Sequence, residues 1–413
     1  MCRPFLWPLN SSMSSKKPLV CQLGMAGVNF KHNRVDLCYR STSGTTKKHT
    51  SIVDAINDEE LCSQRLQLLN GDWPTACYDC EYMEKSGADS YRQRIKLDTQ
   101  KPDSYFTDNI DPETGKIKNL KRIEFRFDNV CNYACRHCSA EYSSTLEKIV
   151  KKNPDLLEFD ETDLHKLGPS YATRLENLNE IEQFIKDDTI EIEITGGEPF
   201  FQNSFYDCLE KLQPFADRIN FIVTTNGSIA GKFKKYDVKG LLKNFKEVYL
   251  KVSLDGSKSF YNYFREGGDW NNVIANIKSF RELPNIRIGP VVTISNMQAA
   301  RLPEVYKDYF ELDPNPRNFE AGEVIHPNML NPVHLPNALK QRYLKEWLEF
   351  RNNLTDTKHA DRIANFAVHM FKTEERDELA WKQFCSYTDK LDRVHNKRVF
   401  DYFPEWEEFW YKN

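Results

Sequence analysis

The feature of the sequence that most constrains the fold is a group of three closely spaced cysteines. Cys131, Cys135 and Cys138 have C-x3-C-x2-C spacing and come directly after residues 122–127, whose alternating pattern predicts a strand. A structural zinc site takes four ligands, so three thiols do not complete one. They can bind three irons of a 4Fe-4S cluster and leave the fourth open to a small molecule. The spacing therefore indicates a reactive iron site at a strand end.

Charge and hydropathy exclude several classes of protein. The 413 residues include 57 basic and 61 acidic side chains, a net charge of -4, which gives no electrostatic case for binding nucleic acid or a membrane surface. No stretch approaches the roughly 20 apolar residues that a membrane span needs. We therefore expect a cytoplasmic protein of two or three packed units. In a reducing compartment the eleven cysteines are better explained by metal binding than by disulfides.

The composition divides the chain into five segments. Residues 1–19 predict a flexible start, 20–96 a small cysteine-rich α+β domain, 97–120 a polar linker and 329–413 a helical, aromatic extension. In residues 121–328 predicted strands alternate with predicted helices, which favours an α/β fold with a parallel sheet forming a full or partial barrel. The predicted strands are 122–127, 191–195, 220–225, 247–254, 286–294 and 323–325, and the predicted helices are 174–186, 204–212, 270–282 and 302–310.

Small and polar residues follow the ends of these predicted strands. The strand at 191–195 runs into Gly196-Gly197-Glu198-Pro199, where two glycines allow a sharp turn and the close approach of a ligand. The carboxyl ends of parallel barrel strands meet at one edge, where barrel enzymes keep their sites. The other residues at or near this edge are Asn226, Ser253, Asp255, Arg265 and Asn296.

Each of these residues, taken alone, has an ordinary structural explanation. Gly-Gly-Glu-Pro is most often a turn, and Ser-x-Asp at a strand end most often caps the next helix. Asn226 and Asn296 also suit left-handed turn positions, and Arg265 suits a solvated ion pair. The order of the segments, one after each successive strand, favours a shared functional edge.

In this order the segments resemble the radical S-adenosylmethionine (radical SAM) superfamily, over roughly residues 121–326. The resemblance implies a partial (β/α)6 barrel and a 4Fe-4S cluster on Cys131, Cys135 and Cys138. It also implies that Gly196, Gly197 and Glu198 bind the amino group of S-adenosylmethionine. His137 stands where the family usually has an aromatic residue that packs on adenine. The remaining cofactor-binding residues implied by the resemblance are Asn226, Ser253, Asp255, Arg265 and Asn296.

A second group of thiols, Cys21, Cys38, Cys77 and Cys80, precedes the barrel. Four thiols complete either a tetrahedral zinc site or a fully ligated iron-sulfur cluster, and spacing alone does not choose between them. The region is similar to the auxiliary-cluster domain called twitch, a shortened relative of the SPASM domain, although that domain usually follows the barrel. The resemblance favours a second iron-sulfur cluster, with zinc as the alternative.

The resemblance implies an enzyme that reductively cleaves S-adenosylmethionine and uses the 5'-deoxyadenosyl radical to abstract hydrogen from a substrate. Relatives with twitch or SPASM domains point to a peptide or protein side chain. The alternative substrate is a carbohydrate, nucleoside or other small metabolite. A ferredoxin or flavodoxin is the expected electron donor. Two further interpretations are a non-catalytic zinc-binding interaction protein and a methyl-transferring enzyme, although no additional cysteine pair stands near the barrel for methyl transfer.

Overall fold

The computed structural model describes residues 16–31, 34–85, 87, 89–156, 158–159, 178–184, 189–312, 320–324, 327–353, 370–372 and 376–411. Most of the predicted flexible start lies outside these residues. Of the predicted helix at 174–186, residues 178–184 are described, and they form a 3-10 helix, Leu178–Phe184, rather than an α-helix. The chain divides into two compact units. Unit 1 comprises residues 1–127, 169–193 and 214–220, and unit 2 comprises residues 128–168, 194–213 and 221–413.

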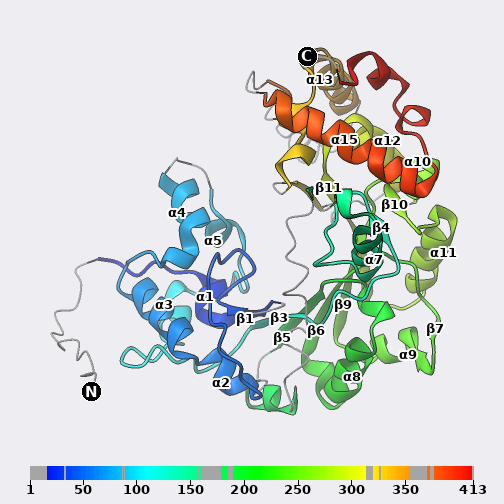
Figure 1. Cartoon of the computed structure of the whole chain (residues 1–413). Coiled ribbons are helices and arrows are strands. Elements are labelled where there is room, and N and C mark those ends of the chain that lie inside the picture. The colour runs from blue at the N-terminus through cyan, green and yellow to red at the C-terminus, as the bar shows by residue number, and fades with distance from the viewer. Residues whose placement is uncertain are drawn as a thin grey trace. The chain divides into compact units, whose positions relative to one another are not determined.

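The strands form a mostly parallel sheet (Figure 1), and its order confirms the predicted α/β fold of partial-barrel type. Six strands are neighbours in chain order, and two N-terminal strands, which the sequence did not predict, extend the sheet. The order is β12 (Glu320–Glu323), β11 (Ile286–Ile294), β9 (Glu247–Ser253), β6 (Ile219–Thr225), β5 (Ile190–Thr195), β3 (Arg122–Arg126), β1 (Gly27–Phe30) and β2 (Val35–Asp36). β12 begins earlier than the predicted range 323–325.

Unit 1 contains the described part of the N-terminal segment, which carries Cys21, Cys38, Cys77 and Cys80. β1 pairs with β3 in parallel and with β2 antiparallel. Ser51 and Asp58 cap the two helices that follow, because each side chain accepts a backbone N–H of the first turn. The segment predicted as a linker carries a helix and an isolated bridge between Ile110 and Ile117, both buried. The helices are α1 (Gln22–Ala26), α2 (Ile52–Ile56), α3 (Glu59–Leu69), α4 (Tyr78–Lys85), α5 (Tyr91–Arg94) and α6 (Asp103–Thr107).

Unit 2 carries three of the four predicted helices, those at 204–212, 270–282 and 302–310. In β9 the buried residues Val248, Leu250 and Val252 alternate with more exposed ones, as a strand with one core face requires. The helices of this part are α7 (Ser144–Lys152), α8 (Asn203–Leu212), α9 (Val238–Leu242), α10 (Lys258–Phe264), α11 (Trp270–Phe280) and α12 (Asn296–Leu312). Two short antiparallel pairs accompany them, β4 (Ala134–Cys135) with β10 (Arg265–Glu266) and β7 (Lys232–Phe233) with β8 (Tyr236–Asp237).

The C-terminal part is helical, as predicted. It contains α13 (Asn337–Asn352) and α15 (Glu378–His395), which is the long orange-red helix in Figure 1. Trp381, Phe403 and Trp406 are fully buried, and the rings of Phe403 and Trp406 stack with centroids 4.1 Å apart. This aromatic core holds α15 in place. None of the helices described is long and apolar enough to cross a membrane.

Candidate metal centres and cofactor site

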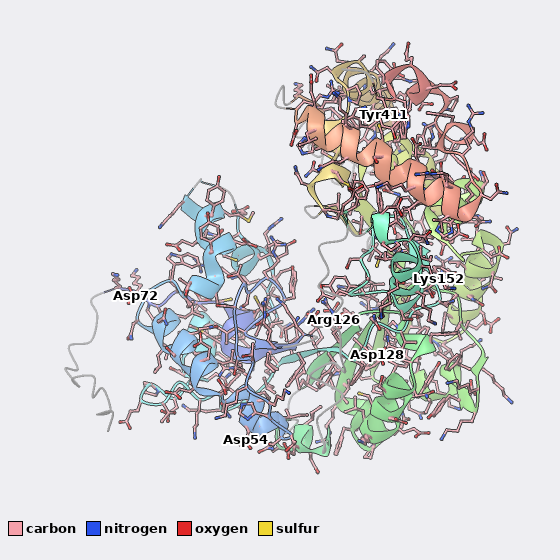
Figure 2. All side chains as sticks on the ribbon, in the orientation of Figure 1. Asp54, Asp72, Arg126, Asp128, Lys152 and Tyr411 are labelled. Atoms are coloured by element: carbon pink, nitrogen blue, oxygen red, sulfur yellow. The ribbon has the colours of Figure 1, made fainter. Side chains whose placement is uncertain are left out.

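The loop with three thiols begins at Asp128, labelled in Figure 2, directly after β3. One Asp128 carboxylate oxygen accepts the Val130 N–H at 2.8 Å, and the other accepts the Ser204 hydroxyl at 3.3 Å. Cys135 lies on β4, which pairs with Arg265 on β10. The loop is therefore fixed both at its start and at its middle thiol.

A buried ion pair fixes the loop from the C-terminal part of unit 2. The Arg136 side chain donates to the Asp392 carboxylate of α15 at 2.6 Å and lies over the Tyr263 ring, 3.9 Å from its centroid. Asp392 also accepts the Tyr263 hydroxyl at 3.1 Å and the Val399 N–H at 2.6 Å. The Tyr387 hydroxyl donates to the Arg136 carbonyl at 3.0 Å. Arg136, which directly follows the second thiol Cys135, is thus anchored to α15.

The three thiols interact with one another electrostatically. Burial raises the pKa of Cys131 to about 12 and of Cys135 to about 11, and it raises the pKa of Cys138 well above its ordinary value. The nearby thiols raise the pKa of Cys131 and Cys138 further, because adjacent thiolates repel. The Cys131 sulfur also accepts the Tyr133 N–H at 3.5 Å. Three soft sulfur donors in one fixed loop fit three irons of a cluster, whose binding would displace their protons.

The Gly196-Gly197 turn touches the thiol loop. Both glycines have positive φ, +82° and +52°, which side chains other than glycine rarely adopt. A Cβ on Gly197 would lie 2.5 Å from the Val130 carbonyl oxygen. Glu198 then donates its N–H to that same oxygen at 2.9 Å. The absence of a side chain therefore lets the turn after β5 pack directly against the residue before Cys131.

The Glu198 carboxylate is 1% exposed and joins the end of β5 to the end of β6. One oxygen accepts the Thr225 hydroxyl at 2.7 Å and the Phe200 N–H at 3.0 Å, and the other accepts the Asn226 N–H at 2.5 Å. Burial raises the pKa of Glu198 to about 7 in spite of these bonds. Such a carboxylate gains from a cationic partner such as an ammonium group, because the cation compensates its lost hydration.

We expect the stability of the unliganded protein to fall, relative to Glu198→Gln, as pH rises from 5 to 8. The folded protein binds this proton more tightly than the unfolded chain does, so the stabilisation is complete at low pH and is lost as pH rises through about 7. The expected change in the wild-type-minus-variant difference is about 3 kcal/mol. Denaturant unfolding at four pH values measures it, and equal pH slopes in the two proteins would contradict it.

Asp255 and Arg265, both predicted to bind cofactor, are paired with each other. Arg265 donates from Nε at 2.9 Å and from a terminal nitrogen at 2.6 Å to one Asp255 oxygen. The other Asp255 oxygen accepts the Thr293 N–H at 2.7 Å from β11. His137 stacks on Phe264 with centroids 5.1 Å apart, and its buried Nδ1 has no hydrogen-bond partner among the described residues. Ser253 ends β9 and is half-buried.

The two predicted asparagines, Asn226 and Asn296, differ in whether the side-chain oxygen has a hydrogen-bond partner among the described residues. Asn226 donates to the Asn132 side chain at 2.8 Å and accepts the Ser228 N–H at 2.9 Å. Asn296, which is fully buried, donates to the Met329 carbonyl at 2.9 Å, while its Oδ1 has no partner among the described residues. A buried acceptor without a donor is unfavourable, so Asn296 is suited to receive a ligand N–H or O–H.

Several residues that organise the site were missed by sequence reasoning. Gln202 donates to the carbonyl oxygens of Val130 and Gly196 at 3.1 and 3.0 Å. Ser143 donates to the Tyr133 carbonyl at 2.6 Å and Thr145 to the Cys131 carbonyl at 2.7 Å. The run Ser143-Ser144-Thr145 comes at the start of an apolar helical pattern. It is a helix-start signal that could have indicated Ser143 and Thr145. The sequence around Arg136 and around Asp392 contains no pattern that would have indicated their ion pair.

The four thiols of the second group line one cavity in unit 1, together with Trp73, Tyr91, Arg40 and Arg92. Cys21 precedes α1, and its sulfur accepts the Gly24 N–H at 3.4 Å. Burial raises the pKa of Cys21 to about 12 and also raises that of Cys38 and Cys77. By donor type alone, four thiols suit either a cluster or zinc. In their described positions, however, neither these thiols nor any other group of three or more His, Cys, Asp or Glu is arranged to hold a metal ion.

Comparison with known proteins gives one family. Residues 126–297 match the model of the Radical SAM superfamily, and no curated protein matches the sequence. The match does not include residues 20–96, so the twitch-like domain stays a prediction.

Similar solved structures include anSMEcpe with bound AdoMet, at 18% identity and a TM-score of 0.37, where the match covers 56% of this chain and 58% of that one. Streptococcus suis SuiB bound to S-adenosylmethionine matches at 14% identity and a TM-score of 0.29, covering 66% of each chain. SuiB bound to its precursor peptide SuiA matches at 14% identity and a TM-score of 0.31, covering 68% and 69%.

Proposed function

We propose that the protein is a radical SAM enzyme that cleaves S-adenosylmethionine reductively and abstracts hydrogen from a substrate, a proposal supported by the match of residues 126–297 to the Radical SAM superfamily model. The cluster on Cys131, Cys135 and Cys138 would supply one electron to the sulfonium, releasing methionine and a 5'-deoxyadenosyl radical. The observation that carries the proposal is the packing of the three-thiol loop against the Gly196-Gly197-Glu198 turn, which donates the Glu198 N–H to the Val130 carbonyl at 2.9 Å.

The residues around this contact are suited to hold S-adenosylmethionine. Glu198 offers a buried carboxylate to the ammonium group, and Asn296 offers a buried oxygen that no described residue pairs with. Arg265 is held at Cys135 by strand pairing and neutralised by Asp255, so it can share its charge with the methionine carboxylate only in competition with that ion pair. These side chains bind and orient the cofactor and keep the reacting carbon near the substrate.

The proposed substrate is a peptide or protein side chain, modified by oxidation or crosslinking as in maturases. This proposal is supported by the twitch-like pattern of the unit 1 thiols. A carbohydrate, nucleoside or other small metabolite is the second candidate. We further propose that Cys21, Cys38, Cys77 and Cys80 hold an auxiliary iron-sulfur cluster, that a ferredoxin or flavodoxin delivers electrons, and that the enzyme acts in the cytoplasm.

The proposal is tested by anaerobic purification and reconstitution, followed by measurement of iron, sulfide and 5'-deoxyadenosine after reduction with S-adenosylmethionine present. About eight irons per chain with 5'-deoxyadenosine release are expected, because each 4Fe-4S cluster contributes four. About four irons with 5'-deoxyadenosine release would support the proposed enzyme but contradict the auxiliary cluster. Zinc without iron, and no 5'-deoxyadenosine, would overturn the proposal.

A further inference from the structure

The four-thiol cavity of unit 1 contains two arginines whose Nε–H groups have no acceptor in the part of the chain that the structure describes. Arg40 and Arg92 both line the cavity. The Nε atom of each is buried and has no hydrogen-bond partner among the described residues. A buried donor without an acceptor is unfavourable, so each Nε–H calls for an acceptor that the described protein groups do not supply.

The rest of each guanidinium is anchored elsewhere. Arg92 donates from its terminal nitrogens to the Val20 carbonyl at 3.0 Å and to the Glu84 carboxylate at 2.5 Å, and it lies 5.2 Å from the centroid of the Trp73 ring. A terminal nitrogen of Arg40 pairs with Asp79 at 3.0 Å, and its guanidinium lies 4.7 Å from the Tyr91 centroid. Both side chains are therefore held in position while their Nε–H groups stay unsatisfied.

The acceptors that this cavity can offer are sulfur atoms. The cavity is lined by Cys21, Cys38, Cys77 and Cys80, and the Arg92 charge opposes the rise that burial imposes on the pKa of Cys21 and Cys77. A 4Fe-4S cluster with four thiolates would add anionic sulfides in the same space. Hydrogen bonds and cations favour the reduced form of such a cluster, because reduction adds one negative charge to it.

We propose that Arg40 and Arg92 donate Nε–H···S hydrogen bonds to a 4Fe-4S cluster on the four unit 1 thiols and thereby raise its reduction potential. The inference rests on the proposed function, which assigns a cluster to these thiols. In the reaction concerned, the oxidised cluster gains one electron and no covalent bond is made or broken. The arginines make this cluster a better electron acceptor, which suits a role in taking back an electron after hydrogen abstraction.

The test isolates the auxiliary cluster in the full-length protein. The triple variant Cys131→Ala, Cys135→Ala, Cys138→Ala removes the other cluster, and the reconstituted protein is titrated with dithionite while the reduced cluster is followed by electron paramagnetic resonance. Into this background are placed Arg40→Lys and Arg92→Lys, which keep the charge but remove the Nε–H, and Arg92→Gln, which removes both. Arg94→Gln is the matched control, because Arg94 is exposed on the same helix and outside the cavity lining.

Each lysine variant is expected to shift the reduction equilibrium at least tenfold toward the oxidised cluster, which is 59 mV for one electron. Arg92→Gln is expected to shift it further, and Arg94→Gln less than twofold. Lysine variants that retain iron and shift no more than Arg94→Gln would overturn the inference. A triple variant that binds zinc or no metal would instead overturn the auxiliary cluster itself, so the two failures are distinguishable.

Discussion

Replacing Cys135 with alanine is expected to abolish the release of 5'-deoxyadenosine. Cys135 is the middle thiol of the loop and is fixed on β4 opposite Arg265, so its substitution leaves the loop with two thiols. With two thiols left, the site is expected to lose its cluster, about four irons per chain. The unit 1 thiols are expected to keep their metal. Iron analysis and quantification of 5'-deoxyadenosine after reduction measure both effects.

The matched control is Cys208→Ala, which removes a fully buried thiol of α8. This variant is expected to keep wild-type iron content and product release. If Cys135→Ala retained all of its iron and released 5'-deoxyadenosine at the wild-type rate, the assignment of the cluster to the Cys131–Cys138 loop would be wrong.

Asp392→Ala is expected to destabilise unit 2 by about 3–5 kcal/mol, because it leaves the Arg136 guanidinium as an uncompensated buried charge. The Arg136 and Asp392 side chains are 2% and 9% exposed, so water does not replace the lost partner. The variant also removes the acceptor of the Tyr263 hydroxyl and of the Val399 N–H. Denaturant unfolding followed by tryptophan fluorescence measures the loss.

The matched control is Asp389→Ala, one turn earlier on α15, where the lost bonds are those from the Tyr411 hydroxyl at 2.7 Å and the Trp410 indole N–H at 3.1 Å. Its expected cost is about 1–2 kcal/mol, because neither bond involves a second charged group. The double variant Arg136→Met, Asp392→Leu is expected to recover most of the stability, because both charges are gone. A midpoint for Asp392→Ala equal to that of Asp389→Ala would show that the ion pair contributes little.

The sequence predicted those parts of the site that are encoded locally. The three thiols and the Gly196-Gly197 turn lie within a few residues of a strand end, so the strand pattern was enough to indicate them. The strand at Ile286–Ile294 was predicted with its observed bounds. α12 was predicted over 302–310, yet the helix runs from Asn296 to Leu312 and includes Pro303, a residue that is unusual in a helix interior.

Several of the interactions that sequence reasoning missed join residues far apart in the sequence. β1 joins the sheet by pairing with β3, although the two strands are separated by the thiol-bearing segment. The pairing of Asp255 with Arg265 was also missed, because each residue was matched to the cofactor separately. Arg136 and Asp392 are separated by 256 positions in the sequence. Sequence patterns relate residues that are close together in the chain, so they do not predict contacts between residues that only folding brings together.

The contact between Arg136 and α15 also sets an order of assembly. During synthesis the thiol loop is complete long before Asp392 has been added to the chain. Until then the loop lacks its buried counterion and the hydroxyl of Tyr387 that holds its backbone. Synthesis must therefore have passed Asp392 before the loop is locked, so a cluster that enters the locked loop would enter only after that point.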